Sequence, residues 1–83
     1  MNDNIQVIVL VNGGTIISRI DQVMSELGEP DCKLTKPRLA EGMLPWMGHL
    51  TDQTDDIMIS SDKILTMVDP KQSLLDAYLT AIQ

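Results

Sequence analysis

The sequence predicts a mainly β protein, a small open barrel of five antiparallel strands followed by one C-terminal α-helix. Short runs of aliphatic and β-branched residues alternate with clusters of Gly, Pro, Asn and Asp, which is typical of strands joined by turns. A helix-start signal appears only near the C-terminus. With 83 residues, the chain is expected to form a single domain over residues 1–83, with the barrel at about 5–68 and the helix at about 70–82.

The first two strands are predicted to form a hairpin around Asn12-Gly13-Gly14. An apolar run at residues 5–11 precedes this tripeptide, and a β-branched run at residues 15–20 follows it. Glycine reaches positive φ without steric cost, so the tripeptide is expected to close a tight primed turn.

The end of the second strand allows two interpretations. The apolar spacing of residues 20–27 fits a short helix as well as a strand. The strand is favoured because the hairpin register supports continued pairing, and Gly28-Glu29-Pro30-Asp31 should then end it.

A third strand is predicted at residues 32–36 and is interrupted by Pro37, with residues 38–41 continuing it past the break. It carries the only basic cluster of the chain, Lys33, Lys36 and Arg38. Two roles fit this cluster about equally. The lysines could keep a solvated edge strand from aggregating, or the three cations could contact phosphates.

Residues 42–50 are apolar but contain Gly and Pro, so they are predicted to form a loop folded over the barrel, and residues 51–56 are its polar, exposed continuation. Trp46 in this loop is expected to cover the core or a subunit contact rather than stack on a base. His49 lacks a second His or Cys at metal-ligand spacing, and the Asp52, Asp55, Asp56 group lacks the pattern of a calcium loop. No metal site and no cofactor are therefore expected.

The last strands are predicted at residues 56–60 and 64–68, joined by a turn at 61–63. The helix should begin with Asp69 as N-cap, Pro70 in the first helical position and Gln72 completing a capping box. An apolar stripe at helical spacing is expected to pack on the barrel or on a neighbouring copy; it comprises Leu74, Leu75, Tyr78, Leu79 and Ile82.

The overall charge limits the possible partners. A formal net charge of −6 argues against a protein that grips duplex nucleic acid over its whole surface, so any nucleic-acid contact must be local. A single cysteine, Cys32, excludes an intrachain disulfide and fits a reducing compartment. No targeting segment or membrane span is recognised, which predicts a cytoplasmic location and no membrane partner.

Two segments resemble the motifs of the Sm/LSm-like family. Residues 9–18 resemble the first Sm motif, in which a strand, an Asx-Gly turn and a second strand open the fold. Residues 59–64 are similar to the second motif, which usually reads Ile-Arg-Gly-Asp/Ser-Asn-Ile/Val, although Ser60, Ser61 and Lys63 replace its Arg, Gly and Asn. Over nearly its whole length, and most clearly at residues 28–34 and 61–66, the chain resembles the Sm-like proteins of marine cyanophages.

The resemblance implies an Sm-like, SH3-type open barrel that assembles into a closed homo-oligomeric ring of about five to seven copies. In such rings the fourth strand of one copy pairs with the fifth strand of the next. The expected interface residues are Ile57, Met58, Ile59, Ile64, Leu65 and Met67.

The family also implies a noncatalytic role in RNA metabolism or processing, through binding of single-stranded RNA or other nucleic acid near a central pore. For a phage-encoded protein, the location would be the host bacterial cytoplasm. The residues expected to contact nucleic acid are the basic cluster Lys33, Lys36 and Arg38 and the loop Ser60, Ser61, Asp62 and Lys63.

Two alternatives remain at the level of sequence. The ring could be a protein-interaction or assembly module that uses its acidic face and the loop of Met43, Trp46 and Met47, without binding nucleic acid. An enzyme based on Cys32 and His49 is the least favoured, because no third orienting group or oxyanion element is recognised.

Overall fold

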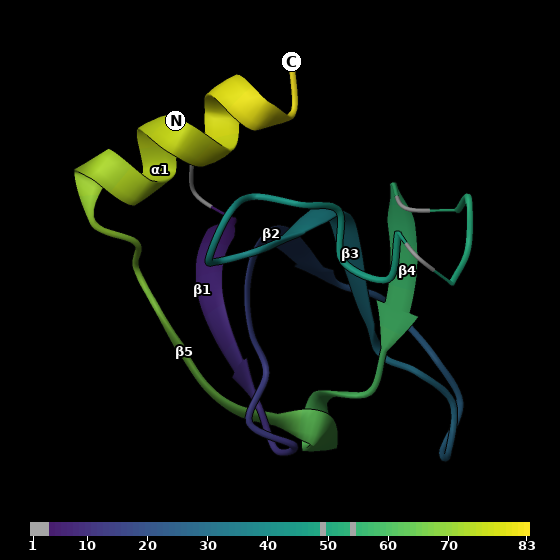
Figure 1. The fold of residues 1–83 in the computed structure, drawn as a ribbon. Helices are drawn as coiled ribbons and strands as arrows, with labels where there is room; N and C mark the ends of the chain where they lie inside the picture. The colour runs from purple at the N-terminus through teal and green to yellow at the C-terminus, as the bar shows by residue number, and fades with distance from the viewer. Residues whose placement is uncertain (1–3, 49, 54) are drawn as a thin grey trace.

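The structure, a computed structural model, describes residues 4–48, 50–53 and 55–83. It contains one five-stranded antiparallel sheet with the strand order β4-β3-β2-β1-β5, followed by a C-terminal helix (Figure 1). The elements in chain order are β1 (Ile5–Leu10), β2 (Thr15–Gln22), β3 (Cys32–Leu39), β4 (Asp56–Ile59), a 3-10 turn (Ser61–Lys63), β5 (Ile64–Val68) and α1 (Gln72–Ala81).

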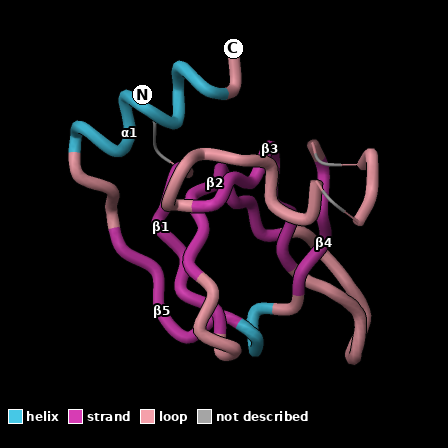
Figure 2. The backbone as a smooth tube through the Cα atoms, viewed as in Figure 1, coloured by secondary structure: helices cyan, strands magenta, loops and turns pink. Residues whose placement is uncertain are grey.

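The sheet is strongly curved but not closed, because β4 and β5 lie at its opposite edges (Figure 2). In the described part of the chain, β4 pairs only with β3, and β5 pairs only with β1. The mainly β fold with five antiparallel strands and a C-terminal helix is therefore confirmed, and two edge strands remain open to pairing.

The two faces of the sheet bury separate clusters of apolar side chains. Ile16 and Ile17 are both fully buried, and as consecutive strand residues they point to opposite faces. The inner cluster contains Ile8, Leu10, Ile16 and Leu34, with Trp46 packed against it. The other contains Ile5, Ile17 and Tyr78, with Met43, Leu74, Leu75, Leu79 and Ile82 packed against it. The apolar stripe of α1 thus packs on the sheet, as predicted, and Trp46 covers the core.

The hydroxyl of Tyr78 connects α1 to a bulge in the sheet. The β2–β3 register shifts between Ile17 and Arg19. At this position the Arg19 N–H donates to the Tyr78 hydroxyl over 3.2 Å, and the hydroxyl donates to the carbonyl oxygens of Thr35 and Lys36 at 3.1 Å. Burial raises the pKa of Tyr78, so the hydroxyl keeps its proton. The helix therefore satisfies backbone groups that the bulge removes from the ladder.

Three sequence predictions about β2 and β3 need correction. The connection between β1 and β2 is the segment 11–14 and not the tight primed turn expected at Asn12-Gly13-Gly14. Gly13 is the one residue of this segment with positive φ, and the Asn12 side chain accepts a hydrogen bond from the Gly14 N–H. Residues 23–27 are neither strand nor helix, since β2 ends at Gln22. Strand β3 runs through Pro37 and lies between β2 and β4, so it is not an edge strand.

The predicted helix start is also wrong. Helix α1 begins at Gln72 with Lys71 as N-cap, and no side-chain hydrogen bond caps it. The Asp69 carboxylate instead accepts a hydrogen bond from the Gln6 amide at 2.8 Å, and Gln72 donates to Asp76 one turn along the helix. The Asp69 carboxylate, which the sequence pattern assigns to the helix N-cap, is thus bonded to Gln6 on β1 instead.

Candidate nucleic-acid interface

Two loops meet at the end of the sheet that lies opposite α1 (Figure 1). One connects β2 to β3 at residues 23–31, and the other connects β4 to β5 at residues 60–63. They lie together because β3 and β4 pair in a register that sets Cys32 opposite Ile59, so that the residues flanking this pair also approach each other.

A bidentate contact joins the two loops. One carboxylate oxygen of Asp31 accepts a hydrogen bond from the backbone N–H of Ser61, and the other accepts from the Ser61 hydroxyl, both at 2.7 Å. These hydrogen bonds hold the pKa of the Asp31 carboxyl below its ordinary value, so the group is charged at neutral pH. The contact fixes the 60–63 turn relative to the start of β3.

A hollow of about 180 Å³ lies between the loops. It is lined by Gly28, Glu29, Asp31, Ser60, Ser61 and Asp62. Gly28 adopts φ +89°, a conformation that a residue with a Cβ rarely takes, so the loop needs glycine at this turn. The lining residues carry three carboxylates and two hydroxyls, so this small site can accept hydrogen bonds from N–H groups but repels phosphate.

The predicted basic cluster is spread along β3 and engaged within the chain. Lys33 lies 3.8 Å from Asp56, and both side chains are about half exposed, so this ion pair is weak. The Lys36 ammonium donates to the Ile82 carbonyl at 3.3 Å, and the Arg38 guanidinium donates to the Met43 carbonyl at 3.1 Å. Lys36 and Arg38 thus contact the C-terminal end of the helix region and the 40–48 loop, whereas Lys33 lies at the start of β3.

The predicted loop residues Ser60, Ser61, Asp62 and Lys63 do lie together, and Lys63 is exposed in the last position of the 3-10 turn. Asp31 was not among the residues predicted to contact nucleic acid. A signal was available, because the resemblance to the Sm-like family puts the first binding loop at about residues 29–33, which include Asp31.

The two edge strands carry the predicted interface residues. Large apolar side chains are exposed on both: Met58 is 47% exposed on β4, and Leu65 and Met67 are 68% and 46% exposed on β5. Ile57 is partly exposed, while Ile59 and Ile64 pack against the inner cluster. Unpaired edges with apolar side chains favour pairing with another strand.

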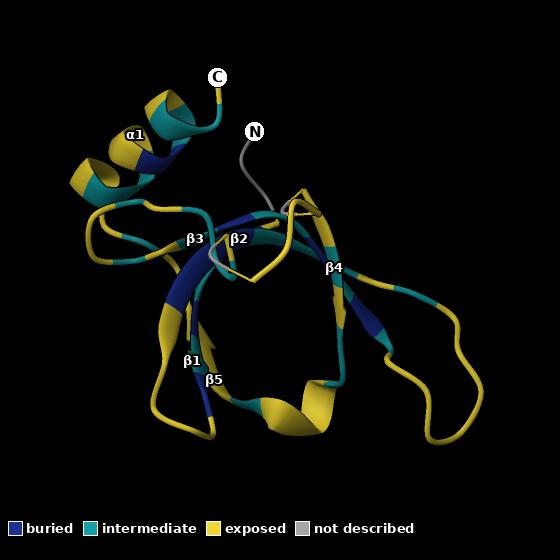
Figure 3. Cartoon of the chain, turned by 45° about the vertical axis from the view of Figure 1, so that its right-hand side comes forward, coloured by how far each residue is buried: buried dark blue, intermediate teal, exposed yellow. Residues whose placement is uncertain are grey.

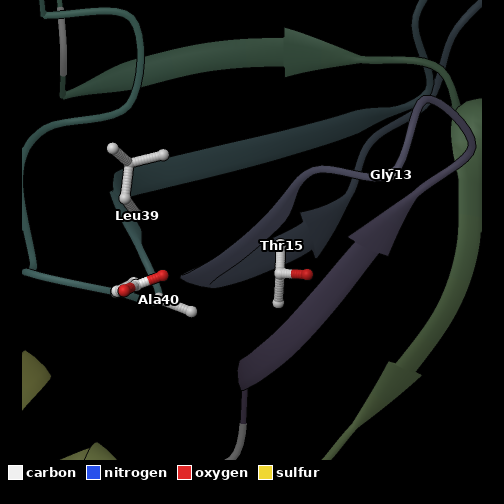
Figure 4. Close-up of a pocket in the computed structure, with 5 residues that line it drawn as sticks. Gly13, Thr15, Leu39 and Ala40 are labelled. Carbon is white, nitrogen blue, oxygen red and sulfur yellow. The ribbon is translucent and has the colours of Figure 1, made fainter.

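The hollow beside the β1–β2 connection and the Cys32 thiol are weaker candidates for a functional site. A hollow of about 550 Å³ beside the β1–β2 connection is lined by Gly13, Thr15, Leu39, Ala40 and Glu41. Figure 4 shows that the Thr15 and Leu39 side chains do not point toward one another, so few groups converge on a ligand. Burial raises the pKa of the Cys32 thiol, and the Asp31 charge raises it further, which makes the thiol a weak nucleophile.

The part of the chain that the structure describes, residues 4–48, 50–53 and 55–83, offers neither a cluster of metal ligands nor a helix that could span a membrane. No group of three His, Cys, Asp or Glu side chains is placed there to hold a metal ion. His49 lies outside those ranges. Within them, α1 is too short to cross a membrane, and no other helix is a candidate span.

The fold and the site define a small antiparallel β protein with a C-terminal helix, two unpaired edge strands and an acidic hollow between two loops. The chain belongs to DUF6561, a family of unknown function, whose profile matches residues 3–83. No curated protein matches the sequence.

Proposed function

We propose that this protein is a noncatalytic, Sm-like subunit that assembles head to tail into a closed ring and binds single-stranded RNA at the 23–31 and 60–63 loops. The observation that carries the proposal is the pair of unpaired edge strands, β4 and β5, with the two loops clamped together at one end of the same sheet. A strand order that leaves β4 and β5 at opposite edges suits a heterologous interface, because one edge can pair with the other edge of the next copy.

Pairing of the β4 and β5 edges between copies would also remove exposed apolar side chains from water. A chain of this length has a small core, and the two edges expose Met58, Leu65 and Met67 to water. Pairing β4 with β5 of the next copy would bury these side chains and supply partners for the free backbone groups of both edges. Rotation between successive copies then closes the ring and leaves no edge unpaired.

The charges around the hollow suggest how RNA would bind. Glu29, Asp31 and Asp62 disfavour phosphate but can accept hydrogen bonds from the N–H groups of unstacked bases. Lys63 in the adjacent turn and Lys33 at the start of β3 are the cations closest in sequence to this site, and a ring repeats both around its axis. We therefore propose that bases enter the hollow while these lysines contact the backbone.

A second candidate, a ring that binds protein rather than RNA, is favoured by one observation. The same three carboxylates would accept a basic peptide without the cost of repelling a phosphate chain. The Met43 and Trp46 side chains of the 40–48 loop, in contrast, pack against the protein's own clusters and contribute little to such a surface.

Native mass spectrometry with and without a short oligouridine tests both candidates. A closed multimer that binds oligouridine, and releases it as salt is raised with a slope of about −0.7 per neutralised phosphate, supports the RNA-binding ring. A closed multimer that ignores RNA favours the protein-binding ring. A monomer at all concentrations contradicts both.

A matched pair of variants tests the edge interface. Leu65→Asp places a charge on the β5 edge, whereas Leu50→Asp alters an equally exposed leucine, at 69%, in the loop before β4. The first variant should yield folded monomers with an unchanged β-type circular dichroism spectrum, and the second should assemble like the wild type. Normal assembly of Leu65→Asp would exclude β5 from the interface.

A further inference from the structure

The 23–31 loop carries two large apolar side chains with no cover within the chain. Met24 and Leu27 are 102% and 106% exposed, more than any other large apolar residue on the described surface. The loop projects away from the sheet on the side of β4 (Figure 3). Its backbone is internally braced, since the Val23 N–H donates to the Asp31 carbonyl at 2.9 Å and the Glu29 N–H donates to the Glu26 carbonyl at 3.0 Å.

The exposure of Met24 and Leu27 to water is unfavourable in free energy for an isolated chain. Removing fully exposed Leu and Met side chains from water lowers the free energy of the system. A loop that is already held by internal hydrogen bonds loses little conformational entropy when it docks. The acidic residues Glu26 and Glu29 flank Leu27, so the partner surface should combine apolar and basic groups.

The topology places such a surface on the next copy. Strand β4 ends at Ile59, and β5 begins at Ile64. Every strand pair in the sheet is antiparallel, and when the same pairing continues between copies, the start of the neighbour's β5 lies beside the end of β4. The 23–31 loop adjoins that end of β4, through the Asp31–Ser61 contact.

The surface at the start of β5 combines apolar and basic groups, as the 23–31 loop requires of its partner. Val11 and Leu65 are 56% and 68% exposed there, and the Val11 N–H donates to the Lys63 carbonyl at 2.9 Å. The surface around these residues therefore combines two exposed apolar side chains with one exposed lysine. This composition complements a loop that exposes Met24 and Leu27 and in which Glu26 and Glu29 flank Leu27.

We infer that the 23–31 loop is an intersubunit clasp, in which Met24 and Leu27 of one copy pack on Val11 and Leu65 of the next copy. The inference rests on the proposed ring and adds a second contact to the edge pairing. It assigns the exposed tip of the loop to assembly, while the Gly28–Asp31 base of the loop remains available to line the hollow.

Disulfide trapping tests the clasp directly. Leu27→Cys and Val11→Cys are made in separate chains that both carry Cys32→Ser, so that each chain has one cysteine and no intrachain bond can form. The two proteins carry tags of different size and are mixed before mild oxidation. A heterodimer on a non-reducing gel is the expected result, because the two thiols meet only across an interface.

The control replaces Val11→Cys by Ser73→Cys, on the exposed side of α1. This pair should give no heterodimer above background. Equal trapping of both pairs, or no trapping of Leu27→Cys with Val11→Cys in a mixture whose copies have exchanged, would overturn the clasp.

The strength of the contact is measured by the concentration at which the ring dissociates. The double variant Met24→Ser/Leu27→Ser should raise this concentration at least about tenfold, whereas Leu44→Ser, at a leucine 62% exposed in another loop, should leave it unchanged. A stable wild-type ring with no effect of the double variant would remove the clasp and keep the ring. A monomeric wild type would remove both.

Discussion

Asp31 and Ser61, which are 30 residues apart in the sequence, form a two-point contact in which one carboxylate accepts both the backbone N–H and the hydroxyl of a single serine. Each of the two hydrogen bonds is charge-assisted and only 2.7 Å long. The contact couples the start of β3 to the turn between β4 and β5. The shape of the acidic hollow therefore depends on one side chain.

Removing this side chain should loosen the 60–63 turn without unfolding the sheet. Asp31→Ala deletes both acceptors, so the Ser61 amide should exchange with solvent at least about tenfold faster. Hydrogen exchange followed by NMR measures the change, with Asp52→Ala in the exposed loop before β4 as a matched control. Unchanged protection of the Ser61 amide would show that the backbone alone holds the turn.

The same contact predicts a dependence of stability on pH. The pKa of Asp31 is lowered in the folded protein, so its contribution to the free energy of unfolding is present above the ordinary pKa of an aspartate, about 4, and is lost as pH falls through the lower folded value. The difference in urea midpoint between wild type and Asp31→Asn should therefore shrink as pH falls below about 4. A difference that grows on acidification would contradict the assignment.

The Tyr78 hydroxyl should be important for stability because it is fully buried and bonds three backbone groups. Tyr78→Phe leaves the Arg19 N–H without this acceptor and should lower the free energy of unfolding by about 1–3 kcal/mol. Tyr78→Leu also removes ring packing and should cost more. Thermal unfolding measures both, and Trp46 fluorescence reports on the core because the chain has a single tryptophan. An unchanged midpoint for Tyr78→Phe would mean that water replaces the hydroxyl.

The uncapped start of α1 predicts a stabilising substitution. Lys71 occupies the N-cap with extended backbone angles and no side-chain hydrogen bond to the helix. Lys71→Asp should supply that acceptor, place a negative charge at the positive end of the helix and raise stability by about 0.5–1 kcal/mol. Lys71→Ala is the control, because it removes the lysine side chain without adding an N-cap acceptor. Equal stability of the two variants would indicate that the helix starts elsewhere.

Charge reversal at Lys63 should weaken RNA binding without dissolving the ring, although it also removes the lysine that the clasp sets near Glu26 and Glu29 of the neighbouring copy. Lys63 is exposed in the turn beside the hollow, while the flanking strands carry the proposed interface, so Lys63→Glu should lower oligouridine affinity about tenfold at low salt. Lys71→Glu makes the same charge change at the distant helix start and should have little effect on affinity. Native mass spectrometry and fluorescence anisotropy follow assembly and binding. A monomeric Lys63→Glu protein would contradict the proposal that pairing of the β4 and β5 edges holds the ring.

Much of the local structure could be predicted because it depends on side-chain periodicity. The positions of β1, β4, β5 and the apolar stripe of α1 follow from alternating or helical spacing, and Trp46 covers the core as predicted. Predictions that relied on a single local signal were less successful. Asp69 has the sequence context of an N-cap but bonds Gln6, and the hairpin connection is longer than its glycines suggest.

The candidate site was harder to predict because its residues come from separate loops. The turn at 61–63 could be predicted from the two strands that flank it, but Lys36 and Arg38, which are close in sequence to Lys33, contact other parts of the chain. A basic cluster in the sequence did not become a basic patch, since strand geometry spreads neighbouring residues along β3.

The amino-acid sequence by itself determined the strand-rich class, the C-terminal helix and the apolar composition of the core, because these follow from short-range spacing and burial. Only the tertiary structure decided that β3 is central, that β4 and β5 are the open edges, and that Asp31 meets Ser61. The physical reason is that strand order and loop contacts depend on pairing between segments far apart in the chain, which no local pattern specifies.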